Sequence, residues 1–258
     1  MFDAELAFAN SLADEAAEIA LSYFGTDLEV RTKRDDTPVT EADTGVEEMI
    51  RGRLAARFPD DAVHGEEEGL RGAGPRTWVI DPIDGTKNFA AGIQIWATLI
   101  ALLVDGEPVV GVVSAPALGE RYGAARGSGS TLNGRPIDVS DTGTIGEAFV
   151  ISDGAGSFVG TPNEAWYLDV VARAKRTRGL GDFWAHMVVA RGSADVELAP
   201  EVMLWDYAAL VPVVVEAGGR MTTFEGGPLH HGGSALTTNG ALHDAVLERI
   251  AAGGRSPS

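Results

Sequence analysis

The spacing of apolar residues in the first quarter of the chain predicts two helices. Residues 3–24 carry apolar side chains every three or four positions, with acidic side chains on the opposite face, and Gly25 ends the pattern. A second helix is expected from about residue 44 to residue 58, where a proline follows. Residues 30–43, between the two helices, are polar and charged and include Pro38, so we expect a mobile loop there.

The middle of the chain has the pattern of an antiparallel sheet. Residues 95–103 and 108–114 are apolar and favour strands, and Asp105-Gly106 between them is typical of a hairpin turn. Residues 122–125 and the turn Asn133-Gly134 are expected to continue the same sheet.

Beyond about residue 145 the pattern changes to strand and helix segments. A strand is expected at residues 148–152, and Pro212 predicts a kink in one of the helices that follow. The helices are expected at residues 164–176, 183–191, 207–217 and 239–251. This order of elements indicates an α+β first half and an α/β second half.

We predict that these elements form a single domain over residues 5–250. Its subdomains are expected at about residues 1–140 (α+β) and 141–250 (α/β), sharing one core, with the active site between them. Residues 252–258 are expected to form a disordered tail.

Composition narrows the classes of partner. The 258 residues carry a net charge of −18, which argues against binding to nucleic acid or to an anionic membrane. The absence of cysteine excludes disulfides and thiolate chemistry. The N-terminus lacks the order of a signal peptide, and no apolar run approaches the roughly 20 residues of a membrane span. We therefore expect a cytoplasmic protein that acts on a small molecule.

The most informative stretch follows an apolar strand expected at residues 77–80. Asp81 and Asp84 come directly after it, and a proline and a glycine hold them in a turn. Neighbouring carboxylates repel each other and are costly to desolvate, so a fold that places them together indicates a bound cation. Hard oxygen ligands without cysteine point to Mg²⁺.

Two other acidic residues occupy similar positions, where an apolar element meets a turn. Glu66 lies in a Gly-Glu-Glu-Glu run, and Asp206 lies where a strand-like segment leads into a helix. Asp206 has a second interpretation, because aspartate is also a favoured helix N-cap. We expect Glu67 and Glu68 to be solvated charges rather than ligands.

These residues predict the hydrolysis of a phosphate monoester. Paired cations clamp the attacking and leaving oxygens and lower the pKa of a bound water. The backbone N–H groups of Gly85 and Thr86 are candidates for holding phosphate oxygens, because glycine permits a close approach. The Thr86 hydroxyl, next to an acid such as Asp43, is a candidate for orienting the water.

Residues 65–67, 81–86, 205–206 and 216–219 together resemble the motifs of the inositol monophosphatase superfamily of magnesium-dependent, lithium-sensitive phosphatases. The resemblance covers about residues 5–250. It implies a layered αβαβα sandwich, a homodimer, and two or three Mg²⁺ ions per site. The metal ligands that it implies are Glu66, Asp81, the Ile83 carbonyl, Asp84 and Asp206.

The resemblance also implies roles for other groups. Thr86 and Asp43 would position the nucleophilic water, with Glu66 acting through a metal-bound water. Lys33 would lie in the mobile loop that closes over the third metal position. Asp84, Gly85, Thr86 and Asp206 would contact the substrate.

Within the superfamily, the chain is most similar to histidinol-phosphate phosphatases. The matching stretches are residues 89–96, 112–117, 181–183, 231–235, 238–240 and 243–244. This similarity implies hydrolysis of L-histidinol phosphate in histidine biosynthesis. The alternatives are a phosphatase of inositol 1-phosphate or of sugar phosphates more broadly and, in another class, a non-catalytic metal-binding regulator.

The choice of substrate depends on the second half of the chain. An acid and an aromatic at Asp182 and Phe183 suit a cationic leaving group, although Asp182 also fits an N-cap and Phe183 a core position. Arg178 is a candidate phosphate contact, or part of a basic helix end that faces water. Ala199 stands where relatives commonly carry an acid, which weakens the assignment of the substrate.

Overall fold

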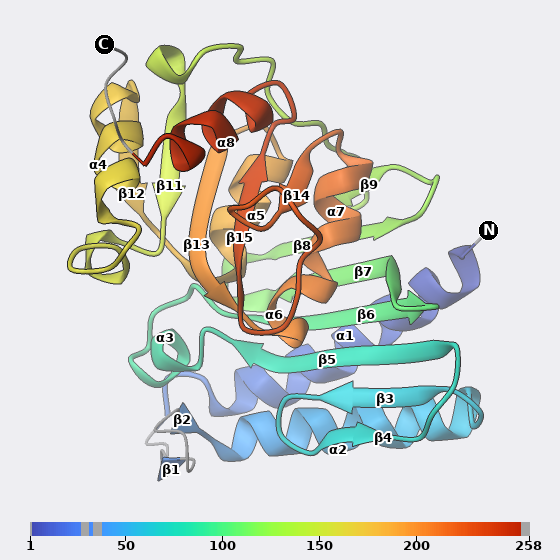
Figure 1. The fold of residues 1–258 in the computed structure, drawn as a ribbon. Coiled ribbons are helices and arrows are strands. Elements are labelled where there is room, and N and C mark those ends of the chain that lie inside the picture. Colours follow the sequence, from blue (N-terminus) through green and yellow to red (C-terminus); the bar gives the residue numbers. More distant parts are fainter. Residues whose placement is uncertain (1, 27–30, 33–37, 254–258) are drawn as a thin grey trace. The chain divides into compact units, whose positions relative to one another are not determined.

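The computed structural model describes residues 2–26, 31–32 and 38–253 (Figure 1). The chain forms two compact units, which are considered separately below. The first contains Met1–Pro136 and Trp205–Val213, and the second contains Ile137–Leu204 and Val214–Ser258. The chain therefore returns to the first unit for a short segment that contains Asp206.

The first unit is built on an eight-stranded sheet with the order β10-β9-β8-β7-β6-β5-β3-β4. Every pair of neighbours is antiparallel except β3 and β5. The strands are β3 (Ala62–Gly65), β4 (Gly69–Arg71), β5 (Arg76–Asp84), β6 (Ala97–Val104), β7 (Glu107–Ala115), β8 (Glu120–Ala125), β9 (Ser130–Leu132) and β10 (Arg135–Pro136).

Two long helices cover one face of this sheet. They are α1 (Asp3–Tyr23) and α2 (Glu41–Arg57). Four buried alanines of α1 and the apolar stripe of α2 share a core with Trp78, Ile80 and Ile100 of the sheet. The unit also contains α3 (Thr86–Ala90), the 3₁₀ turn η1 (Pro116–Leu118) and the paired strands β1 (Arg31–Thr32) and β2 (Pro38–Val39).

Both turns predicted from the sequence are present in the sheet. Asp105 and Gly106 join β6 to β7 with φ of 52° and 84°, and Asn133 and Gly134 join β9 to β10 with φ of 51° and 74°. Positive φ at both central residues is the geometry that Asn-Gly and Asp-Gly favour, and its twist matches that of the flanking strands. The predicted antiparallel sheet is confirmed.

The second unit contains a five-stranded mixed sheet with the order β12-β11-β13-β15-β14. Strand β11 is parallel to β12 and β13, and the other pairs are antiparallel. The strands are β11 (Phe149–Ser152), β12 (Arg176–Gly179), β13 (Val196–Val202), β14 (Arg220–Thr222) and β15 (Gly233–Thr238). The helices of this unit are α4 (Glu164–Arg173), α5 (Asp182–Ala190) and α8 (His243–Ala251), with 3₁₀ turns η2 (Ile145–Glu147) and η3 (Ala155–Ser157). Helix α6 (Leu204–Ala208) lies almost wholly in the segment that returns to the first unit, and α7 (Leu210–Glu216) begins in that segment.

Alternation along β11 assigns helices to the two faces of this sheet. Val150 packs in a core with residues of α4 and α8, whereas the next residue, Ile151, packs with residues of α5. Successive strand residues point to opposite faces, so α4 and α8 cover one face and α5 covers the other. Glu197 is the register partner of Ile151, and Thr237 is the register partner of Glu197, so both lie on the α5 face.

Several predicted boundaries were wrong. The second helix begins at Glu41 instead of about residue 44, because Thr40 and Asp43 form a capping box at its N-terminus. The helix predicted to end at residue 176 ends at Arg173, and strands β12 to β15 were not predicted. These strands are short, or their polar residues hide the alternation on which the prediction depends. The disordered tail falls largely on residues 254–258, outside the described part of the chain.

Pro212 has the predicted effect. The single helix expected over residues 207–217 is divided into α6 and α7, which meet at Ala209. Pro212 is the third residue of α7, where the missing N–H costs no helical hydrogen bond. The break allows the backbone at Ala209 to lie directly against Gly111 of β7.

This contact generates a test of the first unit. A Cβ atom at Gly111 would overlap the Ala209 carbonyl oxygen, which belongs to the backbone. We expect Gly111→Ala to lower the free energy of unfolding by about 1–3 kcal/mol because the backbone has to shift. Gly123→Ala, on the adjacent strand β8, is the matched control, since its Cβ would meet Leu6 at an ordinary 3.6 Å. Equal stability of the two variants in urea unfolding would contradict this account.

Candidate metal centre

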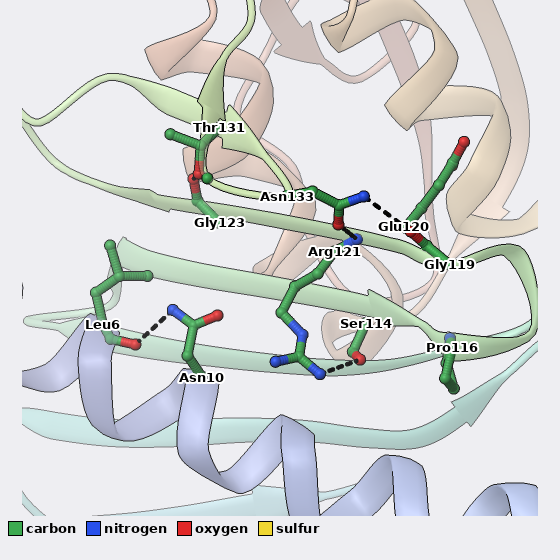
Figure 2. A pocket seen from close by; sticks show the side chains of 11 residues that line it. Leu6, Asn10, Ser114, Pro116, Gly119, Glu120, Arg121, Gly123, Thr131 and Asn133 are labelled. Atoms are coloured by element: carbon green, nitrogen blue, oxygen red, sulfur yellow. Dashed lines mark hydrogen bonds between the residues drawn. The ribbon is translucent and has the colours of Figure 1, made fainter.

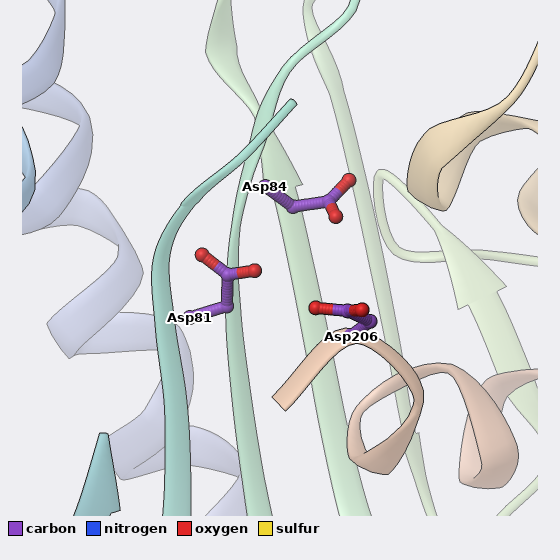
Figure 3. A group of neighbouring side chains, drawn as sticks. All are labelled: Asp81, Asp84 and Asp206. Atoms are coloured by element: carbon purple, nitrogen blue, oxygen red, sulfur yellow. The ribbon is translucent and has the colours of Figure 1, made fainter. Parts of the chain in front are cut away.

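Asp81 and Asp84 lie at the end of β5, where its pairing with β6 becomes irregular. Asp81 is opposite Leu99 and Asp84 is opposite Ala97, so the register shifts between them. In a regular strand, residues three apart face opposite sides of the sheet. The bulge cancels this alternation and lets both carboxylates turn toward the same space (Figure 3). The Thr98 hydroxyl holds the bulge by donating to the Pro82 carbonyl at 2.9 Å.

The turn that follows requires a glycine. Gly85 has a φ of 80°, and a Cβ there would lie 2.9 Å from the Ile95 carbonyl oxygen. Asn88 Nδ2 donates to the same carbonyl at 2.9 Å. Helix α3 starts at Thr86, whose hydroxyl donates to the Ile83 carbonyl at 3.0 Å. The strand end and the start of α3 are therefore held as one rigid corner.

Asp206 completes a group of three carboxylates. One oxygen each from Asp81, Asp84 and Asp206 lies within 4.8 Å of the others (Figure 3). Asp206 is the third residue of α6, not its N-cap, so the capping interpretation was wrong. Trp205, the preceding residue, packs edge-on against His64 of β3 with ring centroids 5.8 Å apart, which fixes this end of α6 to the sheet.

The electrostatics of the site favour a bound cation. Asp81 is only 2% exposed, and its Oδ1 has no hydrogen-bond donor. Burial raises the pKa of Asp81 well above its ordinary value, and the charges of Glu66, Asp84, Asp206 and Asp43 raise it further. Buried carboxylate oxygens without donors are the ligands that a hard divalent cation takes. The residues present therefore fit Mg²⁺, and all five acids are in the first unit.

The support for Glu66 was not predicted from the sequence. Glu47 of α2 is fully buried, and its carboxylate accepts from the backbone N–H groups of Glu67 and Glu68 at 2.8 and 3.0 Å. Arg51, one turn later, donates from Nε to the same carboxylate at 2.8 Å. Gly65 leaves the space that Glu47 fills. The only signal in the sequence was an acid and an arginine at i and i+4, which is commonplace on helices.

Asp43 has a structural partner at the start of α2. Its Oδ2 accepts from the backbone N–H and the hydroxyl of Thr40, at 2.8 and 2.6 Å, and the side chain is fully buried. The charge of Asp43 also acts on Asp81. Its pairing with Thr86 stays a prediction. Lys33 lies outside the described residues.

The predicted substrate residues of the second unit are at the surface. Asp182 is exposed, follows the N-cap Gly181 as the first residue of α5, and has a φ of 50°. Phe183 is 1% exposed, which agrees with the core interpretation. Arg178 lies in β12, not at the end of a helix, and its guanidinium donates to the Thr177 carbonyl at 2.7 Å.

A separate pocket in the first unit includes none of the predicted site residues. It has a volume of about 590 Å³ and lies between α1, β7, β8 and the β9–β10 turn (Figure 2). Arg121 points into it, donating to the Ser114 hydroxyl at 3.3 Å. It contains Arg121, which pairs with Asp14, so this pocket is distinct in chemistry from the acidic centre.

Comparison with known proteins agrees with the fold and the site. The structure of an inositol monophosphatase from Thermotoga maritima matches with a TM-score of 0.87 at 31% identity. The match covers 96% of this chain and 97% of that chain. The structure of an inositol monophosphatase from Anabaena matches with a TM-score of 0.86 at 30% identity, over 97% of this chain and 96% of that chain. The family model of the inositol monophosphatases matches residues 3–253. The chain belongs to the inositol monophosphatase family, and the fold class predicted from the resemblance is confirmed.

Individual relatives are more similar still. A histidinol-phosphatase of Streptomyces coelicolor is 46% identical over 256 residues, covering 94% of this chain and 95% of that protein. A histidinol-phosphatase of Mycobacterium tuberculosis is 45% identical, covering 96% and 98%. A fructose-1,6-bisphosphatase/inositol-1-monophosphatase of Thermotoga maritima is 33% identical, covering 95% of each. Among the described residues, no helix has the length and hydropathy that crossing a membrane requires.

The contacts of Glu47 generate a prediction about the turn that carries Glu66. We expect Glu47→Gln to lower the free energy of unfolding by about 1–3 kcal/mol, because an amide cannot accept all three hydrogen bonds and leaves buried donors unmet. Mg²⁺ affinity, measured by calorimetry, should fall as the turn loosens. Glu48→Gln, at the exposed neighbouring position, is the control and should change neither quantity. A Glu47→Gln variant with unaltered Mg²⁺ affinity would show that this contact does not position Glu66.

Proposed function

We propose that this chain is a Mg²⁺-dependent phosphatase that hydrolyses L-histidinol phosphate to L-histidinol and phosphate. The observation that carries the phosphatase chemistry is the convergence of the Asp81, Asp84 and Asp206 carboxylates, in which Asp81 is buried and its Oδ1 has no hydrogen-bond donor. The choice of substrate is supported by the relatives that are 45–46% identical, both named histidinol-phosphatase.

The proposed metal ligands come from three separate segments. Glu66 follows β3, Asp81 and Asp84 end β5, and Asp206 is in α6, with the Ile83 carbonyl as a further ligand. We propose two or three Mg²⁺ ions. When bound, Mg²⁺ would acidify a water and neutralise charge that develops on the phosphate.

The remaining roles are assigned to groups of the chain itself. The N–H groups of Gly85 and Thr86 are proposed to hold phosphate oxygens, since the first N–H groups of a helix have no partner within it. The Thr86 hydroxyl and Asp43 are proposed to orient the attacking water, with Glu66 as a further acceptor of its protons. In this role Thr86 would exchange its hydrogen bond to the Ile83 carbonyl for one to the water. Lys33 belongs to the loop proposed to close over the third metal.

The leaving group is assigned to the second unit. Asp182 is exposed and acidic, which suits the positive charge of histidinol, and Arg178 is a candidate phosphate contact. We further propose a homodimer in the cytoplasm. The competing substrate is inositol 1-phosphate, because a relative named inositol-1-monophosphatase, from Synechocystis, is 35% identical and covers 92% of this chain.

The metal site is tested by Asp84→Asn. Removing one charged ligand should reduce kcat by at least about 100-fold and weaken Mg²⁺ binding, because the clamp on the phosphate oxygens is lost. The melting temperature without Mg²⁺ should stay the same or rise, since one of the charges repelling Asp81 is gone. Asp60→Asn, at an exposed position, is the control. Turnover by Asp84→Asn at the rate of the unaltered protein would refute the site.

The substrate is tested by steady-state kinetics with Mg²⁺ on L-histidinol phosphate and inositol 1-phosphate. We expect kcat/KM to be at least tenfold higher for L-histidinol phosphate, about 1.4 kcal/mol of transition-state preference. A tenfold preference for inositol 1-phosphate would replace the proposed substrate while leaving the metal chemistry intact. Hydrolysis of neither compound, with Mg²⁺ still bound, would favour the non-catalytic alternative.

A further inference from the structure

A second group of carboxylates lies within the second unit, and of its members only Asp182 has been given a role above. Glu197 is on β13, Asp153 follows the end of β11, and Asp182 begins α5. Strands β11 and β13 are parallel, and Glu197 is in register with Ile151, two residues before Asp153. The Asp153 carboxylate lies against Gly181, with its Oδ1 3.5 Å from the position that a Cβ would take there. Three elements thus bring three acids to the start of α5.

Glu197 is the unusual member of this group. It is fully buried, and neither of its carboxylate oxygens has a hydrogen-bond donor. Its register partner on β15, Thr237, has its hydroxyl engaged with His186 Nδ1 at 2.7 Å. Burial lowers the pKa of His186 to about 4, so this neighbour is neutral and supplies no positive charge. A buried, ionised carboxylate with neither a hydrogen-bond donor nor a positive charge beside it lowers the stability of the folded state.

The acids in this group act on one another. Burial raises the pKa of Asp153 to about 7, and the charge of Asp182 raises it further. Burial, followed by the charge of Asp153, raises the pKa of Glu197 well above its ordinary value. Each acid of the group therefore disfavours the ionised form of its neighbours. Asp153 and Asp182 are exposed, so a ligand reaches the group from solvent.

The distance between the carboxylate oxygens indicates which kind of cation each group of acids can bind. Among the described residues, Asp81, Asp84 and Asp206 are the group whose oxygens converge within 4.8 Å, and the group of Glu197 does not reach that closeness. A single metal ion needs such convergence. A larger cation with several N–H donors can instead give each carboxylate a charge-assisted hydrogen bond.

We propose that Glu197, Asp153 and Asp182 form a binding site for a small organic cation, an ammonium or imidazolium group, with Glu197 as its buried acceptor. In the proposed reaction this cation is the histidinol part of the substrate, and that assignment rests on the proposed function. Glu197 thereby becomes a specificity residue, two positions before Ala199 on the same face of β13.

The test compares Glu197→Gln with Glu201→Gln, an exposed acid on the same strand. L-Histidinol and histamine, which carry no phosphate, are titrated into each protein by calorimetry. We expect Glu197→Gln to bind both at least about 30-fold more weakly than the unaltered protein, and Glu201→Gln to bind them equally well. The ratio of kcat/KM for L-histidinol phosphate to that for glycerol 2-phosphate, which has an uncharged leaving group, should fall about 100-fold in Glu197→Gln alone.

Thermal melting separates a binding role from a structural one. Glutamine has the shape of glutamate without its charge, so Glu197→Gln should melt at the same temperature as the unaltered protein or higher. A lower melting temperature with equal loss of both hydrolytic activities would overturn the proposal in favour of a structural role. Unchanged amine binding in Glu197→Gln would also overturn it.

The same experiments distinguish this proposal from the proposed function. If the unaltered protein binds the amines through Glu197 but does not hydrolyse L-histidinol phosphate, the cation site stands and the proposed substrate fails. If it hydrolyses L-histidinol phosphate and Glu197→Gln changes neither binding nor the ratio, the proposed substrate stands and the cation site fails.

Discussion

The repulsion around Asp81 is the constraint on which the first unit depends. A buried carboxylate beside four other acids is unstable unless a cation joins them, because burial and like charges both disfavour its ionised form. The local structure holds the acids close together despite this repulsion. The bulge at the end of β5 turns Asp81 and Asp84 to one side, Gly85 permits the close corner, and α6 brings Asp206 from far along the chain. Each device restricts the acids to positions that a cation can bridge.

Three fully or nearly fully buried acids show how environment separates structure from function. Glu47 accepts two backbone N–H groups and the Arg51 guanidinium, so its charge is satisfied and serves to shape a turn. Asp81 and Glu197 have carboxylate oxygens with no donor, and the pKa of each is raised. Unmet buried acceptors persist in proteins chiefly where a ligand completes them. This reasoning supports the metal site proposed for the first unit and the organic-cation site proposed for the second.

The two groups of acids also bear on how a charged substrate would meet this acidic chain. A protein with a net charge of −18 repels a phosphate ester from its surface as a whole. A divalent cation at Asp81 would reverse the field locally, and a positively charged leaving group would be attracted by the acids around Glu197. A substrate with one anionic and one cationic end therefore suits this charge distribution better than a neutral polyol phosphate does.

The sequence by itself determined many of the local elements and nominated the acids of the candidate metal centre. Helix periodicity and the Asp-Gly and Asn-Gly turns depend on residues close together in the chain, and those predictions were confirmed. The Asp-Pro-Ile-Asp-Gly-Thr run is local in the same way, and the metal site predicted from it stays a prediction. Tertiary structure alone decided which distant groups support them. Glu47 meets the turn after Gly65, Ala209 meets Gly111, and Glu197 meets Asp153 because sheet register and helix packing bring them together. No local pattern encodes those meetings, since burial and pairing are properties of the folded chain.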